Sequence, residues 1–206
     1  MGETDPAGRS PEALRLIAIV GFLGSGKTTL LLAAAKQLTE QGERVAIIVN
    51  EAGQVPIDGA VLAAGGTRVK EIFGGCFCCQ LAGSLAVGLG EIKAELGVGW
   101  VFVEPSGLAD PEQIEELVGM EGMSRRQVGL IDLDRIEMLR EVLTPLLHKT
   151  VRTADLVLLN KADLVGPAVV EDALEYIRGV DHGAVVRVVS AQQGLPPEVL
   201  AEVLGR

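Results

Sequence analysis

The chain has 206 residues, of which 48% are hydrophobic and 22% charged, a composition typical of a soluble globular protein and not of a disordered or fibrous one. The formal net charge of −10 argues against nucleic acid as a partner, because binding to DNA depends on neutralising phosphates with Lys and Arg. Aromatic residues make up only 3% and glycines number 26, which predicts an aliphatic core and many sharp turns or close approaches to a ligand.

Residues 1–13 are polar and contain two prolines, and we interpret them as a flexible leader before a single domain at residues 14–206. The leader lacks the apolar run of a signal peptide, which favours the cytoplasm as the location. The longest uncharged stretch, residues 72–90, is interrupted by glycines and polar residues, so we expect no membrane span.

From residue 14 onward, short apolar runs alternate with helical patterns. The strand candidates are residues 16–20, 45–49, 69–73, 100–103, 127–131, 156–159 and 185–189. The helix candidates are residues 28–41, 112–117, 135–147, 169–178 and 197–204. Most strand candidates are apolar throughout, as expected when helices cover both faces of a sheet. The alternation predicts an α/β fold with a doubly wound, mostly parallel sheet of about seven strands, whose ligands bind at the carboxyl ends of the strands.

The first strand candidate is followed directly by a phosphate-binding pattern. Residues 21–28 read GFLGSGKT and precede a helix, which is the context this motif needs. Its glycines let backbone N–H groups converge on β- and γ-phosphates, Lys27 adds a mobile charge, and Thr28 offers a hydroxyl to Mg²⁺. The alternative is a glycine-rich turn that only packs a strand on a helix. The residues expected to bind the phosphates are Gly24, Ser25, Gly26, Lys27, Thr28 and Thr29.

An acidic residue, Glu104, ends the strand candidate at residues 100–103. A carboxylate at the tip of a buried strand near a phosphate loop is suited to hold Mg²⁺ or one of its waters. Gly107 follows and has an N–H group for the γ-phosphate. The alternative is a turn that caps the next helix, with Glu104 simply solvated.

The strand candidate at residues 156–159 runs into Asn160-Lys161-Ala162-Asp163. The Asp163 carboxylate can accept two hydrogen bonds from guanine that adenine does not offer, while the Lys161 stem lies over the base. Ser190 and Ala191 end the last strand candidate and offer a backbone N–H group to the guanine carbonyl. A polar turn and an ATP-using enzyme are the alternatives.

The three cysteines of the chain, Cys76, Cys78 and Cys79, all fall in one glycine-flanked turn. Three thiolates suit a soft or borderline ion such as Zn²⁺. Burial as small hydrophobic residues and redox sensing are the alternatives. The clustering favours metal binding, because random burial would scatter the cysteines.

Taken in order, these segments resemble the CobW-like branch of the CobW/HypB/UreG group of P-loop GTPases, which are associated with metal delivery to metalloenzymes and cobalamin synthesis. Residues 21–28 are similar to the phosphate loop, residues 50–58 to the first switch, and residues 75–79 to the Gly-Cys-x-Cys-Cys signature. Residues 104–111 are similar to the Glu-x-x-Gly-Leu-Ala-Asp-Pro segment. Many members carry a further C-terminal domain, so the resemblance covers the GTPase domain alone.

The resemblance implies a GTP-dependent metallochaperone or metal-insertion factor that binds GTP or GDP, Mg²⁺ and a transition metal, Zn²⁺ or Co²⁺. Lys27, Thr28 and Glu104 would serve hydrolysis. The three cysteines would hold the cargo ion, with Glu51 either as a fourth ligand or as a link to Mg²⁺. No arginine finger or water-positioning glutamine is identifiable, so we expect slow turnover unless a homodimer or a client protein assists. The expected client is a metalloprotein or a cobalamin-related enzyme. The alternative is a regulatory switch that activates such an enzyme by docking, without metal transfer.

Overall fold

The computed structural model describes residues 14–49, 68–71, 98–118, 124–180 and 183–206. Within them a seven-stranded sheet has the order β3-β2-β4-β1-β5-β6-β7, and every neighbouring pair is parallel. The strands are β1 (Arg15–Val20), β2 (Val45–Val49), β3 (Arg68–Glu71), β4 (Trp100–Glu104), β5 (Ser124–Asp132), β6 (Leu156–Asn160) and β7 (Val185–Val188). The predicted doubly wound parallel sheet is confirmed.

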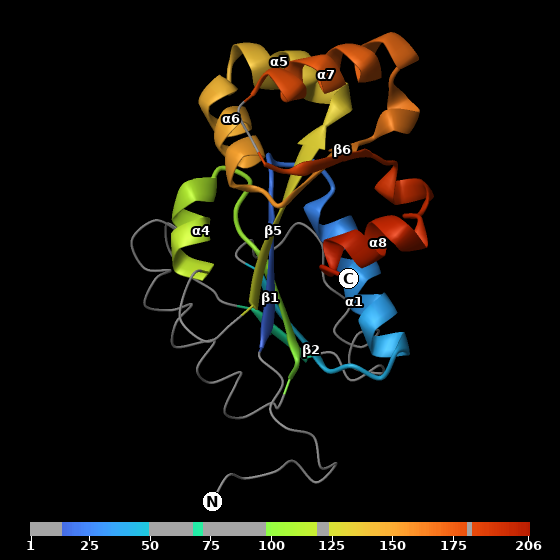
Figure 1. Cartoon of the computed structure of the whole chain (residues 1–206). Helices are drawn as coiled ribbons and strands as arrows, with labels where there is room; N and C mark the ends of the chain where they lie inside the picture. The colour runs from blue at the N-terminus through green and yellow to red at the C-terminus, as the bar shows by residue number, and fades with distance from the viewer. Residues whose placement is uncertain (1–13, 50–67, 72–97, 119–123, 181–182) are drawn as a thin grey trace, which may run out of the picture.

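Helices cover both faces of this sheet (Figure 1). The α-helices are α1 (Lys27–Glu40), α4 (Pro111–Val118), α5 (Ile136–Glu141), α6 (Thr144–Thr153), α7 (Pro167–Gly179) and α8 (Pro197–Val203). Three 3₁₀ turns, η1 (Leu133–Arg135), η2 (Ala162–Leu164) and η3 (Ala191–Gln193), follow the ends of β5, β6 and β7. No helix in the described ranges is long and apolar enough to cross a membrane.

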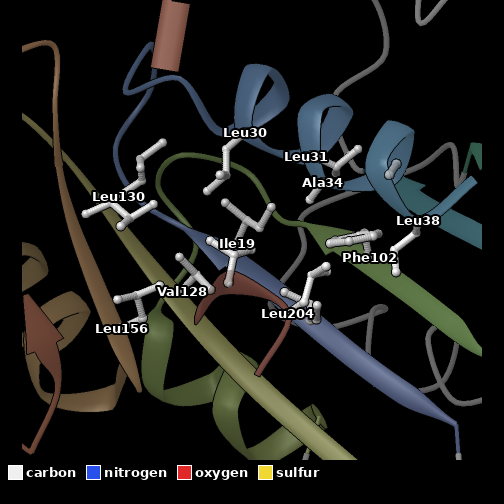
Figure 2. Close-up of a cluster of buried hydrophobic side chains, with 14 of the residues drawn as sticks. Ile19, Leu30, Leu31, Ala34, Leu38, Phe102, Val128, Leu130, Leu156 and Leu204 are labelled. Carbon is white, nitrogen blue, oxygen red and sulfur yellow. The ribbon is translucent and has the colours of Figure 1, made fainter. Parts of the chain in front are cut away.

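The two faces are separated by the alternation of side chains along each strand. Ile17 and Ile19 of β1 pack in one cluster with α1 and α8, as Figure 2 shows for Ile19. Leu16 and Ala18 pack on the other side, with Ile114 of α4. A third cluster joins β5 and β6 to α5, α6 and α7. The core is mainly aliphatic, as the composition predicts, with Trp100 and Phe102 as buried aromatic members.

One predicted helix is wrong in its extent. Residues 135–147 form two helices, α5 and α6, separated at Val142 and Leu143. Pro145 lies in the first turn of α6, where its missing N–H group costs nothing. In the middle of a continuous helix its ring would clash with the carbonyl four residues earlier. The proline therefore starts a new helix, which continues to Thr153.

Candidate functional site

The phosphate-loop pattern, residues 21–28, forms a turn between β1 and α1. Its backbone requires glycine at two places. Gly26 has φ +101°, and a Cβ atom there would lie 2.5 Å from Asn160 Nδ2; a Cβ atom on Gly21 would lie 2.2 Å from the Leu130 carbonyl oxygen. Inside the turn the Ser25 N–H group donates to the Phe22 carbonyl at 3.2 Å. The loop therefore packs closely against Leu130 of β5 and Asn160 of β6.

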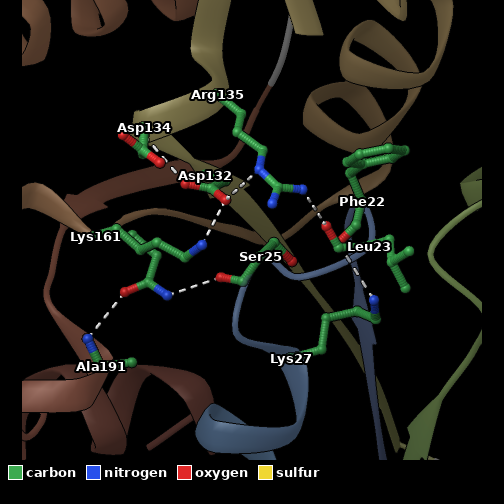
Figure 3. Close-up of polar contacts among 10 residues, drawn as sticks. Phe22, Leu23, Ser25, Lys27, Asp132, Asp134, Arg135, Lys161 and Ala191 are labelled. Carbon is green, nitrogen blue, oxygen red and sulfur yellow. Dashed lines mark hydrogen bonds and ion pairs between the residues drawn. The ribbon is translucent and has the colours of Figure 1, made fainter. Parts of the chain in front are cut away.

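Lys27, the first residue of α1, is only 5% exposed. Its Nζ donates to the Phe22 carbonyl oxygen at 3.4 Å, so the side chain folds back over the loop (Figure 3). The N-terminus of a helix carries a partial positive charge and attracts anions. The loop thus gathers a buried ammonium group and a helix N-terminus at one point, which suits a phosphate chain.

The segment after β4 packs directly against this loop. Thr28 Oγ1 donates to Glu104 Oε1 at 2.9 Å, so the hydroxyl and the carboxylate that we assigned to magnesium lie in contact. A Cβ atom on Gly107 would lie 2.4 Å from the Leu23 backbone nitrogen, which shows how closely the two segments approach. Paired hydroxyl and carboxylate oxygens are the ligands that Mg²⁺ prefers, so the residues fit this ion.

Asn160, which belongs to the segment expected to bind guanine, forms hydrogen bonds within the protein. Its side chain is 3% exposed, and Nδ2 donates to the Ser25 carbonyl at 2.8 Å while Oδ1 accepts from the Ala191 N–H group at 2.9 Å. Both ends of the amide are therefore used within the protein, and so is the Ala191 N–H group that we expected to face guanine. Asn160 therefore fixes the position of the phosphate loop relative to the turn η3, which begins at Ala191.

The other residues expected to bind guanine include Asp163, whose carboxylate is exposed. Asp163 is exposed, and its N–H group donates to Ser190 Oγ at 3.1 Å. Lys161 has φ +65°, a left-handed conformation that sharply turns the chain after β6. Asp163 is thus presented to solvent from a turn that Ser190 braces.

Two residues that we did not predict complete the site. Asp132, at the end of β5, has a side chain that is 0% exposed and accepts from Lys161 Nζ at 2.6 Å. Arg135 has its Nε 3.8 Å from the same Asp132 oxygen, and its Nη1 donates to the Leu23 carbonyl at 3.4 Å (Figure 3). An acidic residue ending a buried strand is the signal that also marked Glu104.

The predicted transition-metal ligands, Cys76, Cys78, Cys79 and Glu51, lie outside the described residues, as do residues 1–13. Among the residues that are described, no group of three or more His, Cys, Asp or Glu side chains could hold a metal ion. His148 Nε2 forms a hydrogen bond with the Tyr176 hydroxyl at 2.9 Å. The cysteine site therefore stays a prediction.

The chain is similar to two proteins of Escherichia coli that are named zinc chaperones. It is 44% identical over 100 residues to the zinc chaperone YeiR of Escherichia coli (strain K12), covering 48% of this chain and 30% of YeiR. It is 30% identical over 170 residues to the zinc chaperone YjiA of the same organism, covering 77% of this chain and 52% of YjiA. The chain thus spans about half or less of the length of these two relatives.

A solved structure of the hydrogenase maturation factor HypB from Archaeoglobus fulgidus shares the fold, with a TM-score of 0.69 and 17% identity over 94% of this chain and 90% of that one. Residues 15–187 match the sequence model of the CobW/HypB/UreG nucleotide-binding domain. That match covers most of the chain and includes the phosphate loop, Glu104 and residues 160–163. The chain therefore belongs to the CobW/HypB/UreG family.

Proposed function

We propose that this chain is the GTP-binding and slowly GTP-hydrolysing domain of a metallochaperone that carries a transition metal, with Zn²⁺ the first candidate. The observation that carries the nucleotide part is the contact of Thr28 with Glu104 at 2.9 Å, beside the loop over which Lys27 folds. The metal part is supported by the Cys-x-Cys-Cys pattern and by the zinc chaperones YeiR and YjiA among the relatives.

The phosphates would bind to the amides of Gly24 to Thr29 and to the Lys27 ammonium group, which stabilises charge on the transferred phosphoryl group. Thr28 and Glu104 would hold Mg²⁺, which neutralises charge on the β- and γ-phosphate oxygens. The Gly107 N–H group would donate to the γ-phosphate.

Asp163 would select guanine, and the Lys161 stem would pack on the base. Lys161 is suited to this because Asp132 fixes its ammonium group at 2.6 Å. Ser190 would act on the base indirectly, by holding the backbone of Asp163 in place. Ala191 would act indirectly on the phosphate loop, by holding Asn160 against Ser25.

The cargo ion would bind to Cys76, Cys78 and Cys79, with Glu51 as fourth ligand. Strand register supports a link to the nucleotide: Val49 of β2 pairs with both Glu71 of β3 and Glu104 of β4. The chain thus leaves β2 and β3 level with Glu104, two residues before residue 51 and five residues before residue 76 respectively. Ordering of these segments by a γ-phosphate would then alter metal binding, and a client metalloprotein would receive the ion after hydrolysis.

The test is the Zn²⁺ affinity of the reduced protein with GDP and with a non-hydrolysable GTP analogue. We expect the two affinities to differ, whereas equal affinities would remove the coupling. Cys78→Ser should weaken Zn²⁺ binding and leave GTP binding intact, while the matched control His148→Ala should alter neither. A triple cysteine variant that binds Zn²⁺ like the wild type would refute the metal site, and purified protein without stoichiometric metal would favour the docking switch.

Base selection needs its own test. Asp163→Asn should reduce GTP affinity strongly and leave ATP affinity low, because the carboxylate supplies the discriminating acceptors. Competition of ATP against a fluorescent GDP analogue measures this. An unchanged nucleotide preference would favour an ATP-using enzyme.

A further inference from the structure

We propose that Arg135 is a catalytic arginine supplied by the chain itself, whose guanidinium group neutralises charge on the β- and γ-phosphates during GTP hydrolysis. This inference rests on the proposed function, since it names a further residue of the same reaction. It concerns a residue that follows β5, outside every sequence motif discussed above.

The position of Arg135 follows from the sheet order. β5 lies next to β1, the strand that precedes the phosphate loop, so the turn η1 after β5 ends beside that loop. Arg135 Nη1 donates to the Leu23 carbonyl at 3.4 Å, and a Cβ atom on Gly24 would lie 3.7 Å from Nη1 and 4.0 Å from Cζ. The guanidinium group therefore lies against the middle of the loop, above the residue whose N–H group is expected to contact the phosphates (Figure 3).

Arg135 is anchored at one end and open at the other. Its Nε lies 3.8 Å from Asp132 Oδ2, an oxygen that Lys161 already approaches to 2.6 Å. The arginine side chain is 47% exposed, and within the described part of the chain its Nη2 makes no hydrogen bond. The 3.4 Å contact with a neutral carbonyl is long, whereas an arginine binds phosphate by shorter, charge-assisted and frequently bidentate hydrogen bonds. We therefore expect the guanidinium group to leave the Leu23 carbonyl and bind the phosphates when a triphosphate is present.

The charge distribution around the loop also suits a polyphosphate. Lys27, Lys161 and Arg135 surround it, in a chain whose net charge is −10. Asp132 is the fully buried acid shared by the last two of these cations. Several cations gathered beside one buried acid suit a ligand with several negative charges, and the carboxylate of Asp132 aims the arginine without reaching the phosphates itself.

In the reaction, a water oxygen forms a bond to the γ-phosphorus while the bond from that phosphorus to the β–γ bridging oxygen breaks. The electron pair of the broken bond stays on the β-phosphate of GDP, and the proton of the water leaves with inorganic phosphate. Negative charge grows on the bridging oxygen during this step. A guanidinium group that reaches this oxygen lowers the barrier more than it strengthens nucleotide binding.

The test is single-turnover GTP hydrolysis by Arg135→Ala and Arg135→Lys, with GDP affinity measured on the same samples. We expect the alanine variant to lose about 100-fold or more in rate, with GDP affinity changed less than about 3-fold, and the lysine variant to keep part of the rate. Arg152→Ala is the matched control, because Arg152 is an exposed arginine at the end of α6 and its loss removes the same charge.

A second readout separates a catalytic from a structural role. The complex of GDP with aluminium fluoride mimics the transferred phosphoryl group, so Arg135→Ala should lose affinity for it while still binding GDP. Hydrolysis within about 3-fold of the wild type, or equal losses in GDP and aluminium fluoride binding, would overturn the proposal. A wild-type protein that binds no GTP would instead refute the proposed function, and this inference with it.

Discussion

The two ends of strand β5 both bury polar side chains, but they use them differently. At the carboxyl end, Asp132 faces cations that come from loops, namely Lys161 at 2.6 Å and Arg135 at 3.8 Å. Toward the amino end, Gln127 Nε2 donates to Thr153 Oγ1 at 2.5 Å and to the Pro111 carbonyl at 3.4 Å, which ties α6 and α4 to the sheet. Buried polarity by itself therefore does not mark a site. Its place relative to the strand ends does, because ligands of open parallel sheets bind at the carboxyl ends.

This difference is testable, because variants at the two ends should separate nucleotide binding from stability. Carboxyl-end variants should lose nucleotide affinity out of proportion to their loss of stability. Variants toward the amino end should lose stability and keep their nucleotide affinity. The four changes below run from the largest expected effect to the smallest.

Gly26→Ala should have the largest effect. The new Cβ atom would lie 2.5 Å from Asn160 Nδ2, in a backbone with φ +101° that alanine adopts with a strain of about 1–3 kcal/mol. We expect GDP affinity to fall about 100-fold, which corresponds to about 2.8 kcal/mol. Titration with a fluorescent GDP analogue measures it. Gly179→Ala is the control, since nothing lies within 4 Å of a Cβ atom there. Equal GDP affinities of the two variants would contradict the close packing of the loop at Gly26.

Asp132→Asn should reduce both the stability of the protein and its affinity for GDP. It keeps the shape of a side chain that is 0% exposed but removes the charge that holds Lys161. Hydrogen bonds to charged groups contribute about 1.5–3 kcal/mol, so we expect a loss of about 2 kcal/mol in the free energy of unfolding. GDP affinity should fall about 10-fold, because Lys161 loses the carboxylate that holds its ammonium group. Urea unfolding and GDP titration on one sample provide both values, and an unchanged GDP affinity would disconnect Asp132 from the site.

Gln127→Ala should affect stability alone. It removes the hydrogen bonds to α4 and α6, which are worth about 1–2 kcal/mol together in a buried place. Thr153 keeps its bond to the Lys149 carbonyl at 2.8 Å, so no new unpaired hydroxyl adds to the cost. The midpoint of urea unfolding should shift while GDP affinity stays the same. A weaker GDP affinity would mean that the amino end of β5 also controls the site.

Local sequence was sufficient for the parts of the site that depend on local conformation. The turn at Gly26 requires a positive φ, and the strand runs are long enough to predict the sheet. The sequence also placed Thr28 and Glu104 at one magnesium site, because the phosphate loop and Glu104 both lie at the carboxyl ends of parallel strands. Their direct contact further requires that β4 lie next to β1.

Other parts depend on which strands are neighbours, and no local pattern contains that information. Arg135 lies beside the loop only because β5 is adjacent to β1. The position of the Asn160 side chain depends on hydrogen bonds with Ser25 and Ala191, which belong to other segments of the chain. Pro145 marks the break between α5 and α6 in the sequence, but the prediction of one helix at residues 135–147 did not take it into account.

The smallest effect is expected from a change at Lys149 of α6, which contacts the start of α4 on the protein surface. Its Nζ lies 2.6 Å from Asp110 Oδ2 and 2.9 Å from Glu112 Oε2. Hydrogen bonds to Asp110 first, and then to Glu112, raise the pKa of Lys149 above its ordinary value of 10.5. A raised pKa means that folding favours the charged form, so the contribution to stability is complete below pH 10.5 and disappears as the pH rises through the folded-state pKa.

Lys149→Met should therefore unfold with a free energy that depends less on pH than that of the wild type across this alkaline range, with GDP affinity unchanged at neutral pH. Lys36→Met is the control, because Lys36 is 73% exposed and lies 3.9 Å from Glu40 in a pair too solvated to matter. Urea unfolding at several alkaline pH values distinguishes the three proteins. Parallel curves for wild type and Lys149→Met would show that the surface contact between α4 and α6 adds nothing to the stability of the protein.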